Sequence, residues 1–159
     1  MKLMQPISLV LLCIAFVPSL AADKKPLTKE ESAKVIEAAI RKSLKKPTGE
    51  LTKADLEKVR ELYLVDDQLT DVKWLEKLTK LTALSLNHNQ LTDVKGLEKL
   101  PQLTCLYLNQ NKLTDVKRLE KLTQLKFLFL DGNPALTKAQ IDQLQKALPN
   151  CKINSNPKK

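Results

Sequence analysis

Residues 59–124 consist of three consecutive 22-residue units, VRELYLVDDQLTDVKWLEKLTK, LTALSLNHNQLTDVKGLEKLPQ and LTCLYLNQNKLTDVKRLEKLTQ. Eleven of the 22 positions are identical in all three units, and nine of these form the sequence LTDVK-x-LEKL. The other half of each unit varies, except at two leucines. A repeat period of about 20–50 residues is typical of a solenoid, whose units bury their apolar side chains only by stacking on one another. A constant framework that carries one variable stretch predicts a solenoid that binds a partner on one face.

Leucines in the variable half of each unit alternate with other residues. The first unit has Leu62 and Leu64 in the stretch ELYLV, and a fourth, partial unit has Leu128 and Leu130 in FLFLD. Alternation with a period of two predicts a strand with one buried face. The rest of each unit is too short for a full helix, so we expect an extended or 3₁₀ return on the convex side. The units therefore predict an α/β solenoid with a short parallel β-sheet on its concave face.

Asparagine holds the ninth position of the second, third and fourth units, as Asn89, Asn111 and Asn133. The turn that follows each strand leaves backbone groups inside the coil, and these groups need hydrogen-bond partners. An amide side chain both donates and accepts, so the three asparagines are expected to form a buried structural ladder. The first unit has Asp67 instead, which accepts only, and we expect Asp67 to be less buried or to contact the N-terminal cap.

A helical cap is predicted in front of the repeats, within residues 23–58. Thr28-Lys-Glu-Glu31 has the form of a capping box, which starts a helix. The residues that follow carry an apolar stripe at helical spacing, Val35, Ile36, Ala39, Ile40 and Leu44. Pro47 and Gly49 stop this helix, and Thr52 begins a second, shorter one. Such a cap is needed because the first unit would otherwise expose its leucines.

A second cap is predicted behind the repeats, which we place at 59–136. Thr137-Lys-Ala-Gln140 is another capping box, and the helix that it starts runs to about Ala147. Leu148, Cys151, Ile153 and Asn156 then repeat the strand phase of the fourth unit at a spacing of 23 residues. We therefore expect residues 137–153 to form a helix and a closing half-repeat, followed by a polar tail at 154–159.

The unit reads L-x-x-L-x-L-x-x-N-x-L, followed by TDV and by two leucines three residues apart. This pattern resembles the leucine-rich repeats of bacterial internalin-like proteins, whose units are also 22 residues long. The resemblance covers roughly residues 34–153 and includes both caps. It implies a leucine-rich repeat solenoid with an N-terminal helical cap, and it implies recognition of a protein partner through the concave strands.

The first residues have the form of a secretory signal peptide, which we place at 1–22. Lys2 gives a basic start, and residues 7–17 are a mainly apolar run too short to span a bilayer. Small residues precede a cleavage site near Ala21–Asp23, so we expect a secreted or periplasmic protein without a membrane span in its mature form. Cys13 raises the alternative of a lipid anchor, but Leu12 is larger than the residue that usually precedes such a cysteine.

The net charge of +9 does not come from the repeats. Residues 59–136 hold 11 basic and 10 acidic side chains, whereas residues 137–159 hold 5 and 1. A nucleic-acid-binding protein concentrates basic residues on its binding face, so the sequence argues against nucleic acid as a partner. Rows of aspartate in the LTDVK segments alternate with lysines, which favours a solvated, charge-paired surface over a calcium site.

Aromatic residues gather at the outward positions of the strands. Apart from Phe16 in the leader and Trp74 on the return side, every aromatic residue lies there. Tyrosine and other aromatic side chains are the usual anchors of protein interfaces, although exposed strand positions also favour aromatics for intrinsic reasons. The predicted partner-binding residues of this concave face are Tyr63, Ser85, Asn87, His88, Tyr107, Asn109, Phe127, Phe129 and Asp131.

The sequence offers no constellation for catalysis, a cofactor or a metal. His88 is the only histidine, and no acidic residue is placed to orient it towards Ser85. Cys105 and Cys151 are predicted to face opposite sides of the coil, beyond disulfide reach. Cys151 is expected to be a small core residue, and Cys105 an outward thiol that can couple two chains or stay shielded by its neighbours.

These observations predict a non-enzymatic binding module that recognises a protein or peptide through its concave face. The alternative is a structural or self-associating module, in which Phe127 and Phe129 form the contact of a homodimer.

Overall fold

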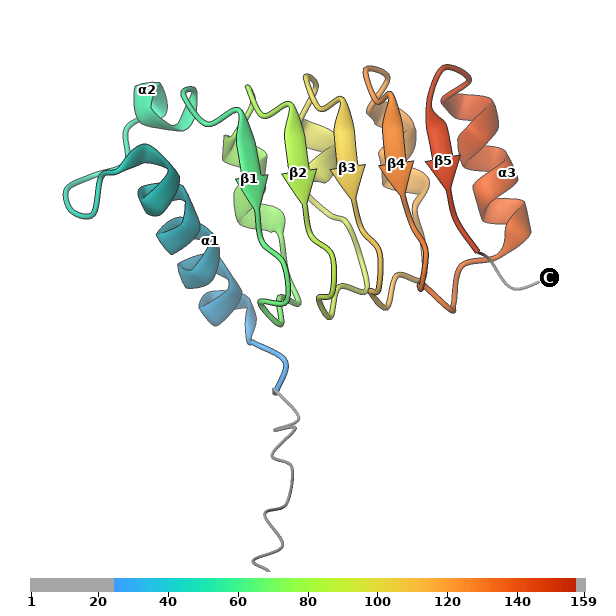
Figure 1. Ribbon diagram of the computed structural model, residues 1–159, viewed down its shortest axis with the longest axis horizontal. Coiled ribbons are helices and arrows are strands. Elements are labelled where there is room, and N and C mark those ends of the chain that lie inside the picture. Colours follow the sequence, from blue (N-terminus) through green and yellow to red (C-terminus); the bar gives the residue numbers. More distant parts are fainter. Residues whose placement is uncertain (1–24, 157–159) are drawn as a thin grey trace, which may run out of the picture.

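The computed structural model describes residues 25–156. Within them, five strands form one parallel sheet in sequence order (Figure 1). Leu62 lies opposite Leu84, and Leu84 opposite Leu106, so equivalent positions of successive units pair with each other. This in-phase stacking confirms the predicted α/β solenoid. The strands are β1 (Glu61–Tyr63), β2 (Ala83–Ser85), β3 (Cys105–Tyr107), β4 (Phe127–Phe129) and β5 (Lys152–Asn154).

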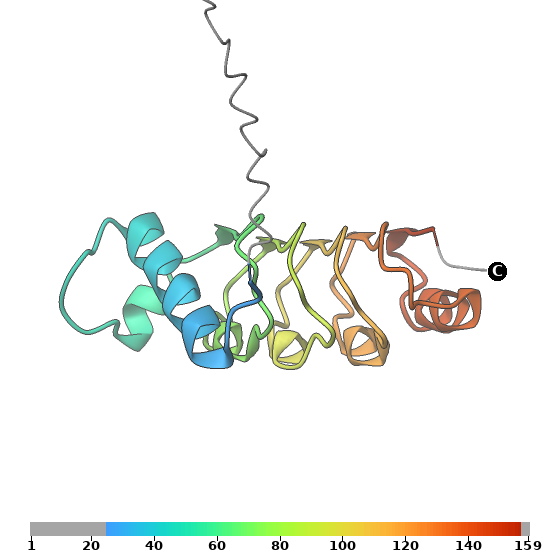
Figure 2. The ribbon, with the colours of Figure 1, turned by 90° about the horizontal axis from the view of Figure 1, so that it is seen from below.

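The return segments contain short 3₁₀ helices, as the length of the repeat predicts. They are η1 (Lys73–Lys77), η2 (Leu97–Lys99) and η3 (Lys117–Lys121), and Figure 2 shows them along the side of the coil opposite the sheet. Each buries the first leucine of its LEKL sequence completely, at Leu75, Leu97 and Leu119. The constant half of the repeat therefore builds the convex side.

The leucines of the strands and of the returns share one interior. Leu62 is 3 % exposed, Leu64 is 1 % exposed, and the strand leucines of the next three units are equally buried. Full burial of a leucine side chain stabilises a fold by about 1.5–3 kcal/mol, so this row supplies most of the driving force. Because the buried leucines of all units form one cluster, the stability of the coil is shared along the stack.

The N-terminal cap is built from α1 (Lys29–Leu44) and α2 (Lys53–Leu56). Thr28 and Glu31 form the predicted capping box, with a 2.7 Å bond from the backbone N–H of Thr28 to the Glu31 carboxylate. Ile36 and Ile40 are completely buried and close the end of the core beside the first unit. No helix among residues 25–156 is long and apolar enough to cross a membrane.

Acid is expected to weaken this cap through Asp55. Lys46 Nζ lies 2.7 Å from Asp55 Oδ2, and hydrogen bonds from Lys46 and Thr52 hold the pKa of Asp55 well below its ordinary value of 3.8. A carboxyl group whose pKa is lowered by folding contributes stability that is complete above its unfolded pKa and is lost as the pH falls through the folded value. Urea denaturation of wild type and Asp55→Asn should therefore give a stability difference that is largest above pH 3.8 and shrinks below it. A difference that stays constant on acidification would contradict this role for Asp55.

The C-terminal cap consists of α3 (Lys138–Ala147), which starts at the predicted capping box of Thr137, and of β5. The register of β5 differs from the prediction. Ile153, and not Cys151, pairs with Leu128, so the spacing is two residues longer than predicted. The helix takes the place of a 3₁₀ return, and the extra residues complete its path back to the sheet. Cys151 precedes the strand and is 4 % exposed, so it is the core residue that the sequence predicts.

Candidate functional site

The outward side of β1 to β4, here called the concave face, carries the side chains between the buried leucines. Parallel pairing aligns them in two rows that cross the sheet. The first row consists of Glu61, Ala83, Cys105 and Phe127. The second row consists of Tyr63, Ser85, Tyr107 and Phe129. Strand pairing thus brings aromatic residues from three units onto one surface.

Tyr107 and Phe129 form a stacked pair in the last two positions of the second row. Their ring centroids are 4.7 Å apart and their planes differ by 7°. Both side chains are half-buried and neither reaches into the leucine core. Each ring restricts the rotation of the other, so the pair is a flat apolar surface with little conformational entropy left to lose on binding.

Tyr63 and Phe127 are the most exposed aromatic residues of the concave face, at 64 % and 48 %. The hydroxyl of Tyr63 donates a 2.9 Å hydrogen bond to Glu61, and this bond raises the pKa of Tyr63 above its ordinary value. A hydrogen bond with Cys105 likewise raises the pKa of Tyr107. Both tyrosines therefore stay neutral, with their rings held along the strand and accessible to a partner.

Ser85 is wrongly predicted as an exposed contact, because only 5 % of its surface is accessible. In the second row it lies between Tyr63 and Tyr107, whose rings are far larger than a serine side chain. The alternation of the sequence correctly places Ser85 on the outward side, but side-chain size decides whether an outward residue is exposed. Ser85 is therefore a spacer between two tyrosines.

The polar residues predicted for the site lie where the strands end. The side-chain oxygen of Asn87 accepts a 2.8 Å bond from the Asn109 N–H, and that of Asn109 accepts a 2.9 Å bond from the Asp131 N–H. The two asparagines thus tie successive units together, and their amide NH₂ groups are the part that a partner can contact. His88 is exposed in a turn with φ 56°, and Asp131 is half-buried.

Asn89, Asn111 and Asn133 point the other way, into the coil, and are between 2 % and 4 % exposed. The side chain of Asn111 donates to the carbonyls of Leu86 and Leu108 and accepts from the N–H of Leu91. The equivalent bonds recur one unit before and one unit after. Asp67 stands at this position in the first unit and is half-buried. These amides hold the turns that position the concave face.

The convex side carries charges in a different arrangement. Arg118 lies 3.5 Å from both Asp93 and Glu98, and Lys77 Nζ lies 4.4 Å from the centre of the Trp74 ring. Burial acts to raise the pKa of Glu98, but hydrogen bonds from backbone N–H groups and the charge of Arg118 bring it below the ordinary value. The Arg118 contacts link the second and third units, whereas the Lys77–Trp74 contact lies within the first unit.

Both cysteines of the described region are free, Cys105 half-exposed on the concave face and Cys151 in the core. Burial raises the pKa of Cys151, which keeps it a protonated, apolar side chain. Within residues 25–156, His, Cys, Asp and Glu side chains do not gather in groups of three that can hold a metal ion.

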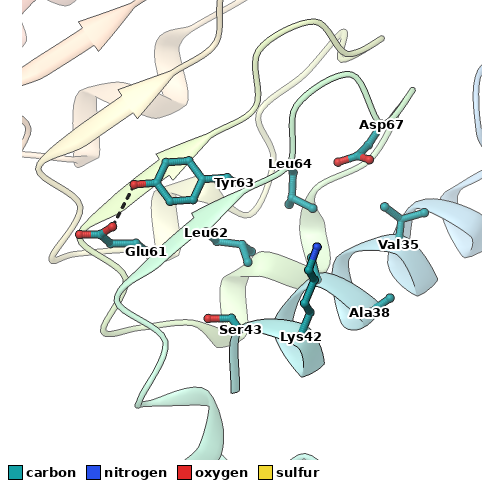
Figure 3. Close-up of a pocket in the computed structure, with 10 residues that line it drawn as sticks. Val35, Ala38, Lys42, Ser43, Glu61, Leu62, Tyr63, Leu64 and Asp67 are labelled. Carbon is teal, nitrogen blue, oxygen red and sulfur yellow. Dashed lines mark hydrogen bonds between the residues drawn. The ribbon is translucent and has the colours of Figure 1, made fainter. Parts of the chain in front are cut away.

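One feature escapes sequence reasoning, a groove of about 810 Å³ between α1 and β1. Figure 3 shows Val35, Ala38 and Lys42 of the helix facing Leu64 and Asp67 of the first unit across this space. We refer to it as the α1–β1 groove. The only hint of this groove in the sequence is the apolar stripe of α1, which includes Val35. The hint is weak, because the same stripe fits a helix that is fully packed against the core.

Comparison with known proteins agrees with this architecture. Residues 57–113 match the family described as "Leucine rich repeat", and residues 101–146 match "Leucine Rich repeats (2 copies)". No curated protein matches the chain.

Solved structures that share the fold include two internalins and a further leucine-rich repeat protein. An internalin (InlF) from Listeria monocytogenes is 25 % identical with a TM-score of 0.65, over 82 % of this chain and 45 % of the internalin. Internalin C2 from the same species is 24 % identical with a TM-score of 0.68, over 79 % and 56 %. A leucine-rich repeat protein from Leptospira interrogans is 31 % identical with a TM-score of 0.59, over 67 % and 28 %. The chain thus spans about half of either internalin and less of the Leptospira protein. It belongs to the leucine-rich repeat proteins, and its fold is internalin-like.

Proposed function

We propose that this chain is an exported binding module that recognises a protein or peptide partner through its concave face. The observation that carries this proposal is the exposure of Tyr63 and Phe127, at 64 % and 48 %, on the same face as the stacked Tyr107–Phe129 pair. Aromatic side chains surrounded by polar groups are typical of the residues that dominate binding energy in protein interfaces. His88, Asp131 and the amide groups of Asn87 and Asn109 supply such a polar rim.

The size of the concave face limits the partner. Four strands at the usual spacing of about 4.8 Å give a width below about 20 Å. A surface of this width suits a peptide or a modest protein contact near the lower end of stable interfaces. We therefore expect one short segment of the partner to fill the face, with the two exposed rings as its main contacts.

Export is part of the proposal and rests on the sequence of residues 1–22, which lie outside the described region. The basic start and the short apolar run support cleavage near Ala21–Asp23 and a secreted or periplasmic location. N-terminal sequencing of the protein from culture fluid and periplasm tests this, and recovery of the chain only with Met1 intact would contradict it.

The binding proposal is tested with Tyr63→Ala and Phe127→Ala, because both side chains are exposed and their removal leaves the core untouched. Partners captured by the wild-type protein are quantified by mass spectrometry and then titrated against each variant. We expect at least about a tenfold loss of affinity for one or both. Lys95→Ala, on the convex side, is the control and should bind as wild type does. Equal binding by all four proteins would place the partner on another surface.

Self-association is the second candidate, and the exposure of Phe127 favours it. Phe127 and Phe129 lie on one strand near the end of the coil, where a second copy can cover both. Light scattering over a range of concentrations separates the two functions. A dimer that dissociates on Phe127→Ala supports self-association, and a monomer at every concentration excludes it.

A further inference from the structure

The first strand of the sheet leaves one edge without a strand partner within residues 25–156. The carbonyl of Arg60 and the N–H of Leu64 both bond to the second unit. In a β-strand the backbone groups of successive residues point to alternate edges. The N–H and C=O groups of Glu61, Tyr63 and Val65 therefore point to the opposite edge of β1, which is the edge that borders α1.

The α1–β1 groove lies along this edge and is apolar at its base. Val35 and Ala39 of α1 are half-buried there, beside the buried Leu62 and Leu64 of the strand. Figure 3 shows Val35 on one side of this space and Leu62 and Leu64 on the other. A groove between a helix and an open strand edge is the setting in which an extended peptide adds to a sheet.

We propose that an extended peptide segment carrying a basic residue binds in the α1–β1 groove as an additional strand of the sheet. Its backbone pairs with Glu61, Tyr63 and Val65. Every second side chain points inward, continues the row of Leu62 and lies over the apolar residues of α1. This site adjoins the concave face and shares Tyr63 with it, because the ring of Tyr63 belongs to the proposed concave-face contact and its backbone faces the groove. Phe127 belongs to the concave face alone.

The charges around the groove favour a basic peptide. Glu61 and Asp67 place two carboxylates on the strand side, and Lys42 places one ammonium group on the helix side. A lysine or arginine of the peptide therefore meets carboxylates on the strand side, whereas Arg41, Lys42 and Lys45 keep the cations on the helix side. A whole second solenoid fits less well, because α1 stands beyond β1 at this end of the coil in both views (Figures 1 and 2).

The probe is a phage-displayed library of random ten-residue peptides, selected on the full exported chain. The strongest peptide is synthesised and titrated against wild type, Ala38→Trp and Phe127→Ala. Ala38 is an exposed helix residue on the groove wall, so tryptophan there fills the groove without entering the core. We expect enrichment of lysine and arginine in the selected peptides and at least about tenfold weaker binding to Ala38→Trp, with Phe127→Ala unchanged.

Failure of the library to give a peptide that depends on Ala38 would overturn the proposal, as would enrichment of acidic peptides. A peptide that loses affinity for Phe127→Ala alone binds the concave face and also overturns it. Ala38→Trp and Phe127→Ala alter different surfaces. A negative result for the groove therefore leaves the proposed function intact, and a negative result for the concave face leaves the groove proposal intact.

Backbone pairing has its own readout in amide hydrogen exchange. The N–H of Tyr63 should exchange at least about tenfold more slowly when the peptide is bound. The N–H of Leu64 already donates to Ser85 and should not change. Two further peptides carry N-methyl groups on every second amide, one on the amides that pair with β1 and the other on the amides that point away from it. The first should not bind, and the second should bind as the unmethylated peptide does. Unchanged exchange at Tyr63, or equal binding by the two methylated peptides, would exclude strand addition.

Discussion

Replacement of Asn111 by alanine is expected to lower the free energy of unfolding by about 3–5 kcal/mol, because several buried backbone groups lose their partners together. The side chain is 4 % exposed. It donates to the carbonyls of Leu86 and Leu108 at 2.9 and 3.1 Å, and it accepts from the N–H of Leu91 at 3.2 Å. Each buried group left unpaired costs about 1–3 kcal/mol, and the cavity left by the amide adds to this.

The position of Asn111 in the middle of the stack makes the loss global. A solenoid unfolds by separating neighbouring units, and this amide joins the second unit to the third. Urea denaturation of the variant should therefore show a lower midpoint, or two transitions if the halves separate.

Two neighbouring substitutions calibrate this result. Lys112→Ala removes an exposed side chain and should change stability by less than about 0.5 kcal/mol. Asn109→Ala removes one half-buried bond to Asp131 and should cost about 1 kcal/mol. A loss for Asn111→Ala no larger than that for Asn109→Ala would mean that water or a local rearrangement satisfies the turn without the ladder.

Most of the fold follows from the period of the sequence. Alternating leucines place one strand in each unit, and identical spacing forces the strands into the same phase, so Leu62, Leu84 and Leu106 pair in register. Both end helices begin at the residues that their capping boxes indicate, Thr28 and Thr137. These features are predictable because each depends on residues close together in the chain or on a repeat that applies one rule many times.

The candidate site is less predictable because it depends on neighbours that are distant in sequence. Alternation places Ser85 and Phe127 on the same face, yet one is 5 % exposed and the other 48 %. The difference comes from the side chains in adjacent units, which the period aligns but whose sizes it does not set. The register of β5 and the α1–β1 groove escape prediction because each depends on how a helix packs at an end of the coil, where the repeat no longer applies.

The second large effect is expected at Gly96, where the repeat itself is misleading. The equivalent residues of the neighbouring units are Trp74 and Arg118, so the sequence suggests that any side chain fits. In the structure Gly96 has φ 102°, and a Cβ atom there would lie 2.9 Å from the Cα and 3.2 Å from the carbonyl oxygen of Lys73. Both are backbone atoms, so they can move away from the added Cβ only if the whole preceding unit shifts. We expect Gly96→Ala to lower the free energy of unfolding by about 2–4 kcal/mol.

Gly132→Ala is the matched control, because Gly132 also has a positive φ, of 72°. Its added Cβ would meet the side-chain amide of Gln110, which can rotate away, and Gln110 itself tolerates φ 55° at the equivalent turn position. The cost there should be about 1 kcal/mol, the strain of a left-handed alanine alone. Chemical denaturation of both variants separates crowding from backbone strain, since only Gly96 combines the two. Equal losses at Gly96 and Gly132 would mean that neighbouring units can slide apart at their convex turns, and that the stack is held chiefly by the sheet and the asparagine ladder.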